Sequence, residues 1–128
     1  MSAGHEIYNE GHLSGAGFTA AAALAAGTFV KPASNATINV AGGATGGHAW
    51  GCLKKDVASG AIPEIITDGE ALALLGDTVT IHQELMSNAA GALIPTTAAG
   101  DIVSALALDT GVVTNRIRVQ LVNYVRHA

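Results

Sequence analysis

The stretch NRIRVQLVNYV, residues 115–125, decides the fold class, because its apolar and polar residues alternate one by one. Successive side chains of a β-strand point to opposite faces, so this period of two predicts a strand with one buried face. One polar residue, Asn123, interrupts the inner face. The inner face carries Ile117, Val119, Leu121 and Val125, and the outer face carries Arg116, Arg118, Gln120, Val122, Tyr124 and Arg126.

The segment before this strand, residues 101–109, is apolar on both of its faces. Such a strand is covered on both sides, here by the core on one side and by a loop or a partner on the other. Further upstream, the short SNAAG segment at residues 87–91 predicts a hairpin. Pro95 in its second arm lacks a backbone donor, which favours an edge strand.

Further short strands are expected at regular intervals along the chain, and together they predict an all-β fold. Residues 20–26 fit a short helix or a strand equally well, and residues 70–75 fit a strand better than a helix. We therefore expect a small single-domain barrel or sandwich of short antiparallel strands at residues 18–128, preceded by an extended, flexible N-terminal arm at residues 1–17. The other expected strands are residues 28–31, 37–40, 50–54, 62–67 and 78–84.

The composition is poor in large apolar side chains. The 128 residues include 25 alanines and 16 glycines, while 4% are aromatic and 12% are charged. Large apolar side chains contribute most to stability per residue buried. This composition therefore predicts a fold that gains part of its stability from a neighbouring subunit, and it argues against a roomy enzyme.

Several protein classes are excluded by the same sequence. A single cysteine, Cys52, rules out an internal disulfide framework. The N-terminus lacks the basic and apolar regions of a secretory signal. The longest apolar run, residues 20–26, is far shorter than the roughly 20 residues that span a bilayer. A net charge of −4 argues against binding to nucleic acid, so we expect neither a nucleic acid nor a membrane as partner.

Possible chemical sites are weakly supported. The glycine-rich stretch at residues 41–51 leads into a strand pattern rather than a helix, so a hairpin connection is expected in place of a phosphate site. His5 and His12 lie near Glu6 and Glu10, but their spacing fits no ligand pair on a rigid element. We therefore predict no enzyme activity, no catalytic or metal-ligating residues and no cofactor.

The second half of the chain carries a family resemblance. LGDTVTIHQELMSNAAGALIPTTAAGDIVSALALD at residues 75–109, followed by RIRVQL at residues 116–121, resembles the Ala/Gly-rich capsid decoration, or cement, proteins of tailed bacteriophages. The resemblance covers residues 27–122. The N-terminal arm and the TGVVTN segment before the last strand depart from the family pattern.

The resemblance implies a structural protein of the virion. Such proteins sit on the outer surface of the phage head, commonly as homotrimers, and cement adjacent subunits of the major capsid protein against the pressure of the packaged DNA. Expected partners are therefore the major capsid protein and further copies of this chain. The expected subunit interface consists of Ile102, Leu106, Leu108, Arg116 and Arg118.

The N-terminal arm is a second expected contact. Its apolar residues have no periodic partners nearby, so they favour a segment that becomes ordered on the capsid or on an adjacent subunit. The residues expected to bind there are His5, Glu6, Ile7, Tyr8, Asn9, Glu10 and Leu13.

Two alternatives to a cement protein stay open. A small β-barrel with scattered histidines is also compatible with a cupin-like metal enzyme or a ligand-binding barrel, although the alternation at residues 78–82 points His82 outward. A virion protein of another kind, at the base of a head fibre or as an accessory of the tail tube, fits the same sequence.

Overall fold

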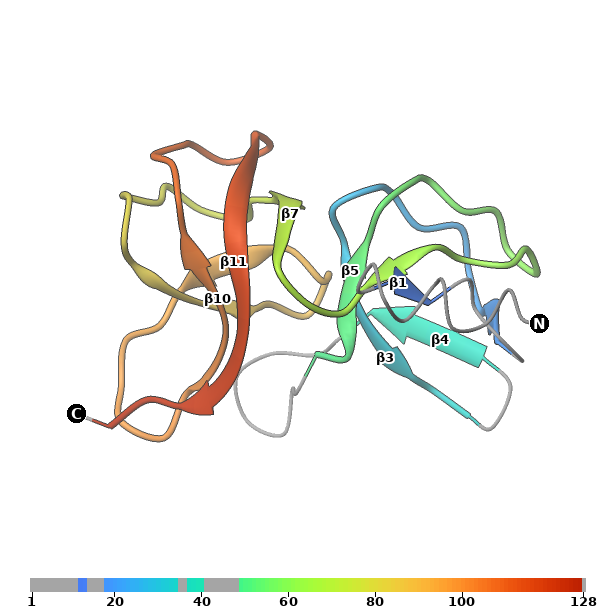
Figure 1. The fold of residues 1–128 in the computed structure, drawn as a ribbon, viewed down its shortest axis with the longest axis horizontal. Coiled ribbons are helices and arrows are strands. Elements are labelled where there is room, and N and C mark those ends of the chain that lie inside the picture. The colour runs from blue at the N-terminus through green and yellow to red at the C-terminus, as the bar shows by residue number, and fades with distance from the viewer. Residues whose placement is uncertain (1–11, 14–17, 35–36, 41–48, 128) are drawn as a thin grey trace.

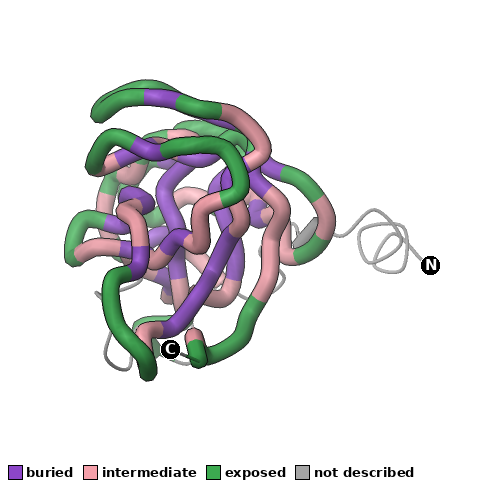
Figure 2. The backbone as a smooth tube through the Cα atoms, turned by 90° about the vertical axis from the view of Figure 1, so that its left-hand side faces the viewer, coloured by how far each residue is buried: buried purple, intermediate pink, exposed green. Residues whose placement is uncertain are grey.

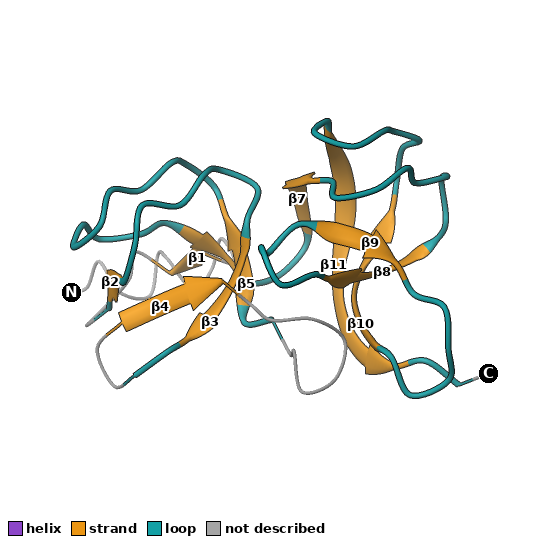
Figure 3. Ribbon diagram, turned by 180° about the vertical axis from the view of Figure 1, so that it is seen from behind, coloured by secondary structure: helices purple, strands orange, loops and turns teal. Residues whose placement is uncertain are grey.

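The computed structural model describes residues 12–13, 18–34, 37–40 and 49–127. These residues form eleven strands in two sheets, so the predicted all-β class is confirmed. Figures 1 and 3 show the two sheets side by side, one built from each half of the chain. None of the described residues belongs to a helix long and apolar enough to cross a membrane.

The first half of the chain forms a six-stranded sheet with the order β1-β6-β5-β3-β4-β2. Its neighbouring strands pair antiparallel, except that β2 runs parallel to β4. Val30 of β3 pairs with Val40 of β4 on one side and with Gly51 of β5 on the other. The strands are β1 (His12–Leu13), β2 (Thr19–Ala20), β3 (Phe29–Pro32), β4 (Thr37–Val40), β5 (Gly51–Leu53) and β6 (Ile65–Ile66).

The second half forms a five-stranded antiparallel sheet with the order β7-β11-β10-β8-β9. The sheet curls into a half-barrel, and its two edge strands approach each other at a bridge between Leu75 and Leu93. There the Gly76 amide donates to the Leu93 carbonyl over 2.8 Å. The strands are β7 (Glu70–Leu74), β8 (Glu84–Ser87), β9 (Leu93–Pro95), β10 (Ile102–Ala107) and β11 (Arg116–Val125).

Two apolar clusters form the core. The larger cluster fills the inside of the curled sheet, where Leu85, Leu93 and Val119 are fully buried, and it includes Phe29 and Cys52 from the six-stranded sheet. Figure 2 shows the buried backbone in the middle of this half and the exposed backbone in its outer loops. The smaller cluster lies on the six-stranded sheet and consists of Ala20, Val30, Ile38, Leu53, Val57 and Ile65.

Backbone hydrogen bonds join the two sheets directly. The Phe29 amide donates to the Gly91 carbonyl over 2.8 Å, and the Leu74 amide donates to the Gly27 carbonyl over 3.0 Å. Gly91 has φ +81°, and a Cβ atom there would lie 2.5 Å from Cγ2 of Thr28. Only glycine combines this backbone conformation with so close an approach. The two sheets are therefore held together by the main chain as well as by shared core residues.

Most of the expected strands are present. β11 alternates as predicted up to Gln120, β8 and β9 form the predicted hairpin, and Pro95 lies on the edge strand β9. Residues 70–74 form β7, as favoured. Residues 20–26 contain no helix: β2 ends at Ala20, and Leu24 makes a single bridge to Val57.

The expected strand at residues 78–84 is wrong. Val79 makes one bridge to Gly111, the chain then turns at residues 81–82, and β8 begins only at Glu84. His82 has φ +75°, which no strand residue adopts. The turn is stabilised by a side chain, because Oε1 of Gln83 accepts from the Thr80 amide over 2.7 Å. Such bonds from side chain to backbone compete with strand pairing and leave no trace in the hydrophobic alternation.

Candidate interaction surfaces

The outer face of the curled sheet carries three of the residues expected at a subunit interface. Along β11, Ile117 and Val119 point into the core, and Arg118 between them is exposed. On β10, Leu106 pairs with Gln120, and the Leu108 amide donates to the Arg118 carbonyl over 2.9 Å. Since residues directly opposite on neighbouring strands share a face, Leu106, Leu108 and Arg118 lie together. We call these three residues the outer sheet face.

Arg118 has its acidic neighbour within the chain. Its Nη2 atom lies 2.8 Å from Oδ1 of Asp109, and its Nε atom lies 3.0 Å from Oδ2. The guanidinium and the Arg118 amide hold the pKa of the Asp109 carboxyl below its usual value, and the carboxylate raises the pKa of Arg118. The Arg118 guanidinium is therefore already paired with a carboxylate of the same chain.

The other two expected interface residues lie elsewhere. Ile102 is buried within the single chain, as are Val103, Ser104 and Ala105 of the same strand. The second face of β10 is thus covered by the chain itself at these positions, whereas Leu106 and Leu108 stay half-buried. Arg116 is exposed near the start of β11 and makes no ion pair with any residue that the structure describes.

Most of the expected arm contacts lie outside the described residues. This holds for His5, Glu6, Ile7, Tyr8, Asn9 and Glu10. The exception is Leu13, which forms β1 together with His12 and pairs with Ile65 of β6. The backbone at these two positions is therefore part of the edge of the six-stranded sheet.

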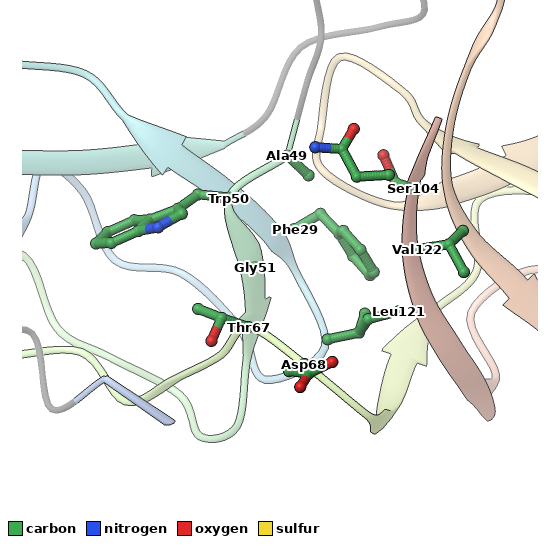
Figure 4. A pocket seen from close by; sticks show the side chains of 10 residues that line it. Phe29, Ala49, Trp50, Gly51, Thr67, Asp68, Ser104, Leu121 and Val122 are labelled. Atoms are coloured by element: carbon green, nitrogen blue, oxygen red, sulfur yellow. The ribbon is translucent and has the colours of Figure 1, made fainter. Parts of the chain in front are cut away.

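A cavity of about 250 Å³ lies between the two sheets (Figure 4). Phe29 and Leu121 project towards it, while the indole of Trp50 points away, towards the six-stranded sheet. The Trp50 ring packs there against Phe18, with 5.1 Å between the ring centroids. The polar part of the lining consists of Thr67, Asp68, Ser104 and Asn123.

A polar network connects β8 with the C-terminal end of β11. The Tyr124 hydroxyl donates to Oε2 of Glu84 over 2.5 Å, and the Arg126 guanidinium donates to the Thr96 carbonyl over 2.8 Å. Arg126 also lies 3.7 Å from the Glu84 carboxylate. The hydrogen bond to Glu84 raises the pKa of Tyr124 to about 12. Sequence reasoning missed this network, because Glu84 and Tyr124 are forty positions apart and meet only through the pairing of β8, β10 and β11.

Titratable side chains do not gather into a metal centre in the part of the chain that the structure describes. No group of three or more His, Cys, Asp or Glu residues there could hold a metal ion. His82 is exposed on the turn before β8. The only thiol in the sequence, that of Cys52, is buried in the larger core cluster, and burial raises its pKa to about 12.

Comparison with solved structures identifies a similar fold. Comparisons with protein-family models and with curated proteins found no match. One solved structure, described as the head fibre gp8.5 N base in bacteriophage phi29, matches with a TM-score of 0.68 and 14% sequence identity. The match covers 81% of this chain and 89% of that chain. The chain therefore has the fold of a phage head-fibre base, and the resemblance to structural proteins of phage heads is confirmed at the level of the fold.

Proposed function

We propose that this protein is a structural component of a phage head that binds the outer surface of the capsid and cements adjacent subunits of the major capsid protein. The observation that carries the proposal is the fold shared with the phi29 head-fibre base over 81% of the chain. The resemblance of residues 75–121 to capsid decoration proteins supports the same place in the virion.

We propose that the protein contacts the capsid through the outer sheet face. Leu106 and Leu108 are only half-buried there, although the alternating positions Ala105 and Ala107 are fully buried. Covering these leucines would remove apolar area from water, which stabilises a complex in proportion to that area. The proposed assembly is a homotrimer on the capsid, in which neighbouring subunits supplement a core that is rich in alanine.

A second candidate function is favoured by the description of the phi29 protein. Its matched part is the base of a head fibre, so this chain is a candidate for a base that attaches a fibre or another projection to the head. A fibre base has to bind the capsid, but it has no need to bridge capsid subunits. The two functions therefore differ in their effect on capsid stability.

The decisive experiment uses expanded capsids that lack the protein. The purified chain is added at increasing concentration, and occupancy is measured by sedimentation and located by cryo-electron microscopy. A cement protein binds across the boundary between capsid subunits and raises the temperature at which the capsids release DNA. A fibre base binds without changing that temperature. Absence of binding to the capsids would contradict both functions.

A further inference from the structure

The cavity of about 250 Å³ between the two sheets has the features of a binding site (Figure 4). Asp68 and Asn123 in its lining are exposed, whereas Phe29 and Ser104 are buried. The cavity therefore opens to solvent on one side and reaches the core on the other. Its volume lies below the roughly 300–1,000 Å³ of sites for drug-sized ligands, so it suits a small molecule.

The buried end of the cavity carries an unsatisfied hydroxyl group. Ser104 of β10 is 4% exposed, and its side chain makes no hydrogen bond with the residues that the structure describes. A buried hydroxyl without a partner costs free energy, so such groups are rare in folded proteins. Its neighbours Val103 and Ala105 are fully buried and apolar, so packing alone does not account for a serine at this position. A hydroxyl group of a bound molecule would supply the missing partner.

A β-bulge lies at the same place. The pairing of β10 with β11 shifts between Val103 and Ala105, so that Ser104 lies beside two residues of β11. Bulges bend a strand, interrupt its pairing locally and are frequent next to functional sites. Asn123, the polar residue that interrupts the apolar alternation of β11, follows this bulge and lines the cavity together with Leu121. The two polar side chains thus meet the cavity where the strand pair is irregular.

The charge of the lining disfavours anionic ligands. Asp68 is acidic, and none of the described residues that line the cavity is a lysine, an arginine or a histidine. Oδ1 of Asp68 accepts from the Gly69 amide over 2.9 Å, and its Oδ2 atom makes no hydrogen bond with the described residues. A carboxylate oxygen only accepts hydrogen bonds at neutral pH. The ligand should therefore bring a donor to Asp68 and carry no negative charge.

A neutral ligand with several hydroxyl groups fits this lining better than a cation does. A hydroxyl group both donates and accepts, so it can pair with Ser104 in either direction and can also donate to Asp68. An ammonium group only donates, and it would lose its hydration at the buried end of the cavity. The Phe29 ring and Leu121 project towards the cavity and offer apolar contact to the carbon atoms of the ligand.

We propose that the cavity between the two sheets binds a small neutral polyol of the size of a single sugar ring. Hydroxyl groups of the ligand bond to Ser104 at the buried end and to Asp68 at the open end, and its carbon atoms pack against Phe29. This site goes beyond the proposed function and does not depend on it. The outer sheet face takes no part, because Leu106 and Leu108 do not line the cavity.

Titration of the isotope-labelled full chain with single sugars, followed by NMR, tests the site and the class of ligand. The probes are glucose, galactose, N-acetylglucosamine and ribose, and the charged comparisons are butylammonium and inorganic phosphate. We expect saturable shifts of the amide signals of Asp68, Ser104 and Asn123 with at least one sugar. The melting temperature should rise in the presence of that sugar, because a ligand that binds only the folded protein stabilises it. No saturable shift with any sugar would overturn the proposal, and so would saturation by butylammonium or phosphate alone.

Two variants test the proposed contacts with the ligand. Ser104→Ala removes the buried hydroxyl, and Asp68→Asn removes the charge but keeps an oxygen that can accept from the Gly69 amide. We expect each variant to weaken the binding of the sugar at least tenfold. Without sugar, Ser104→Ala should melt at or above the temperature of the wild-type protein, because the removal of an unpaired buried hydroxyl breaks no hydrogen bond. A strongly lowered melting temperature would show that the hydroxyl is bonded within the protein, which would overturn the proposal.

The matched control is Asp77→Asn. Asp77 is exposed and accepts from the amide of the next residue over 2.7 Å, as Asp68 does over 2.9 Å, but it does not line the cavity. We expect this variant to bind the sugar like the wild-type protein. An equal loss of affinity in Asp77→Asn and Asp68→Asn would overturn the contact assigned to Asp68. Unchanged affinity in both Ser104→Ala and Asp68→Asn would place the bound sugar elsewhere on the protein and would overturn the proposed site.

Discussion

Asp109 and Arg118 face each other across the connection between β10 and β11, and they form two side-chain hydrogen bonds of 2.8 and 3.0 Å. A third bond joins the Arg118 amide to the same carboxylate over 3.1 Å. One acidic group thus fixes both the side chain and the backbone at Arg118, the third residue of β11. The contribution of this pair to stability is small, because the Arg118 side chain is 61% exposed and that of Asp109 is 35% exposed, so water screens their attraction.

The pair predicts a small dependence of stability on pH. The pKa of Asp109 is lowered in the folded protein, so its contribution is present above the usual carboxyl pKa near 3.8 and is lost as the pH falls through the lower folded value. We expect Asp109→Asn to lower the melting temperature at pH 7 by about 1–3 °C. The difference from the wild-type protein should shrink below about pH 4 and in high salt. A difference that stays constant down to pH 2 would show that the charge of Asp109 is not responsible.

The same pair shows where sequence reasoning ends. The alternation of β11 correctly identified Arg118 as outward-facing, because hydrophobic period is a local property of the chain. Its pairing with Asp109 depends on the register between β10 and β11, which shifts at a bulge between Val103 and Ala105. That register is set by tertiary packing, so the pairing of Arg118 with Asp109 could not be predicted from the sequence.

The edge position of β7 in the curled sheet was missed for a related reason. Residues 70–74 read EALAL, and nothing in that pattern distinguishes an edge strand from a central one. Pro95, by contrast, correctly indicated that its strand, β9, lies at an edge of the sheet, because proline removes a backbone donor whatever its surroundings. Edge strands are thus predictable from sequence only where a residue such as proline marks them.

Tyr124 provides a spectroscopic prediction. Its hydrogen bond to Glu84 raises its pKa to about 12, so an absorbance titration of the folded protein should show one of the two tyrosines ionising near that pH. The raised pKa means that the bond stabilises the fold below about pH 10 and that this contribution is lost as the pH rises towards 12. We expect Glu84→Gln to lower the pKa of Tyr124, and Tyr124→Phe to remove the late ionisation. An unchanged titration in Glu84→Gln would show that the hydrogen bond to Glu84 is not the cause of the raised pKa.

The close contact between the two sheets can be tested by replacing two glycines with alanine. A methyl group at Gly91 would contact Cγ2 of Thr28 and the Phe29 carbonyl, whereas Gly60 has a nearly identical φ of +82° and no atom within 4 Å of the added position. We expect Gly60→Ala to cost about 1 kcal/mol from backbone strain alone, and Gly91→Ala to cost about 2–4 kcal/mol because steric overlap is added. Urea unfolding of both variants measures the difference. Equal costs would show that the contact between the sheets relaxes freely around residue 91.

The thiol of Cys52 should be unreactive towards alkylating reagents in the folded protein. Its thiol is buried beside Phe29 in the larger core cluster, and burial raises its pKa to about 12. The thiolate is the reactive form, so alkylation by iodoacetamide at pH 8 should be undetectable by mass spectrometry in the time that completes it in urea. Rapid modification of the native protein would mean that the contact between the two sheets opens readily at β5.

Two double variants can distinguish the outer sheet face from a second exposed apolar patch as the surface that binds the capsid. Leu106 and Leu108 are half-buried on β10, whereas Val112 and Val113 are 53% and 51% exposed at the turn before β11. We expect the double variant Leu106→Gln with Leu108→Gln to melt within a few degrees of the wild-type protein, because neither side chain belongs to the core clusters. Its occupancy on capsids should fall at least tenfold, which corresponds to about 1.4 kcal/mol.

The matched control for this variant is Val112→Gln with Val113→Gln, which removes a similar number of apolar atoms. If the outer sheet face contacts the capsid, the control binds like the wild-type protein, since residues 112–113 lie on a turn beyond the paired strands. The reverse result, with binding lost only in the valine variant, would place the contact at the turn. In that case Leu106 and Leu108 would be ordinary half-buried residues of a curled sheet, and the end of the half-barrel would be the part of the protein that meets the shell.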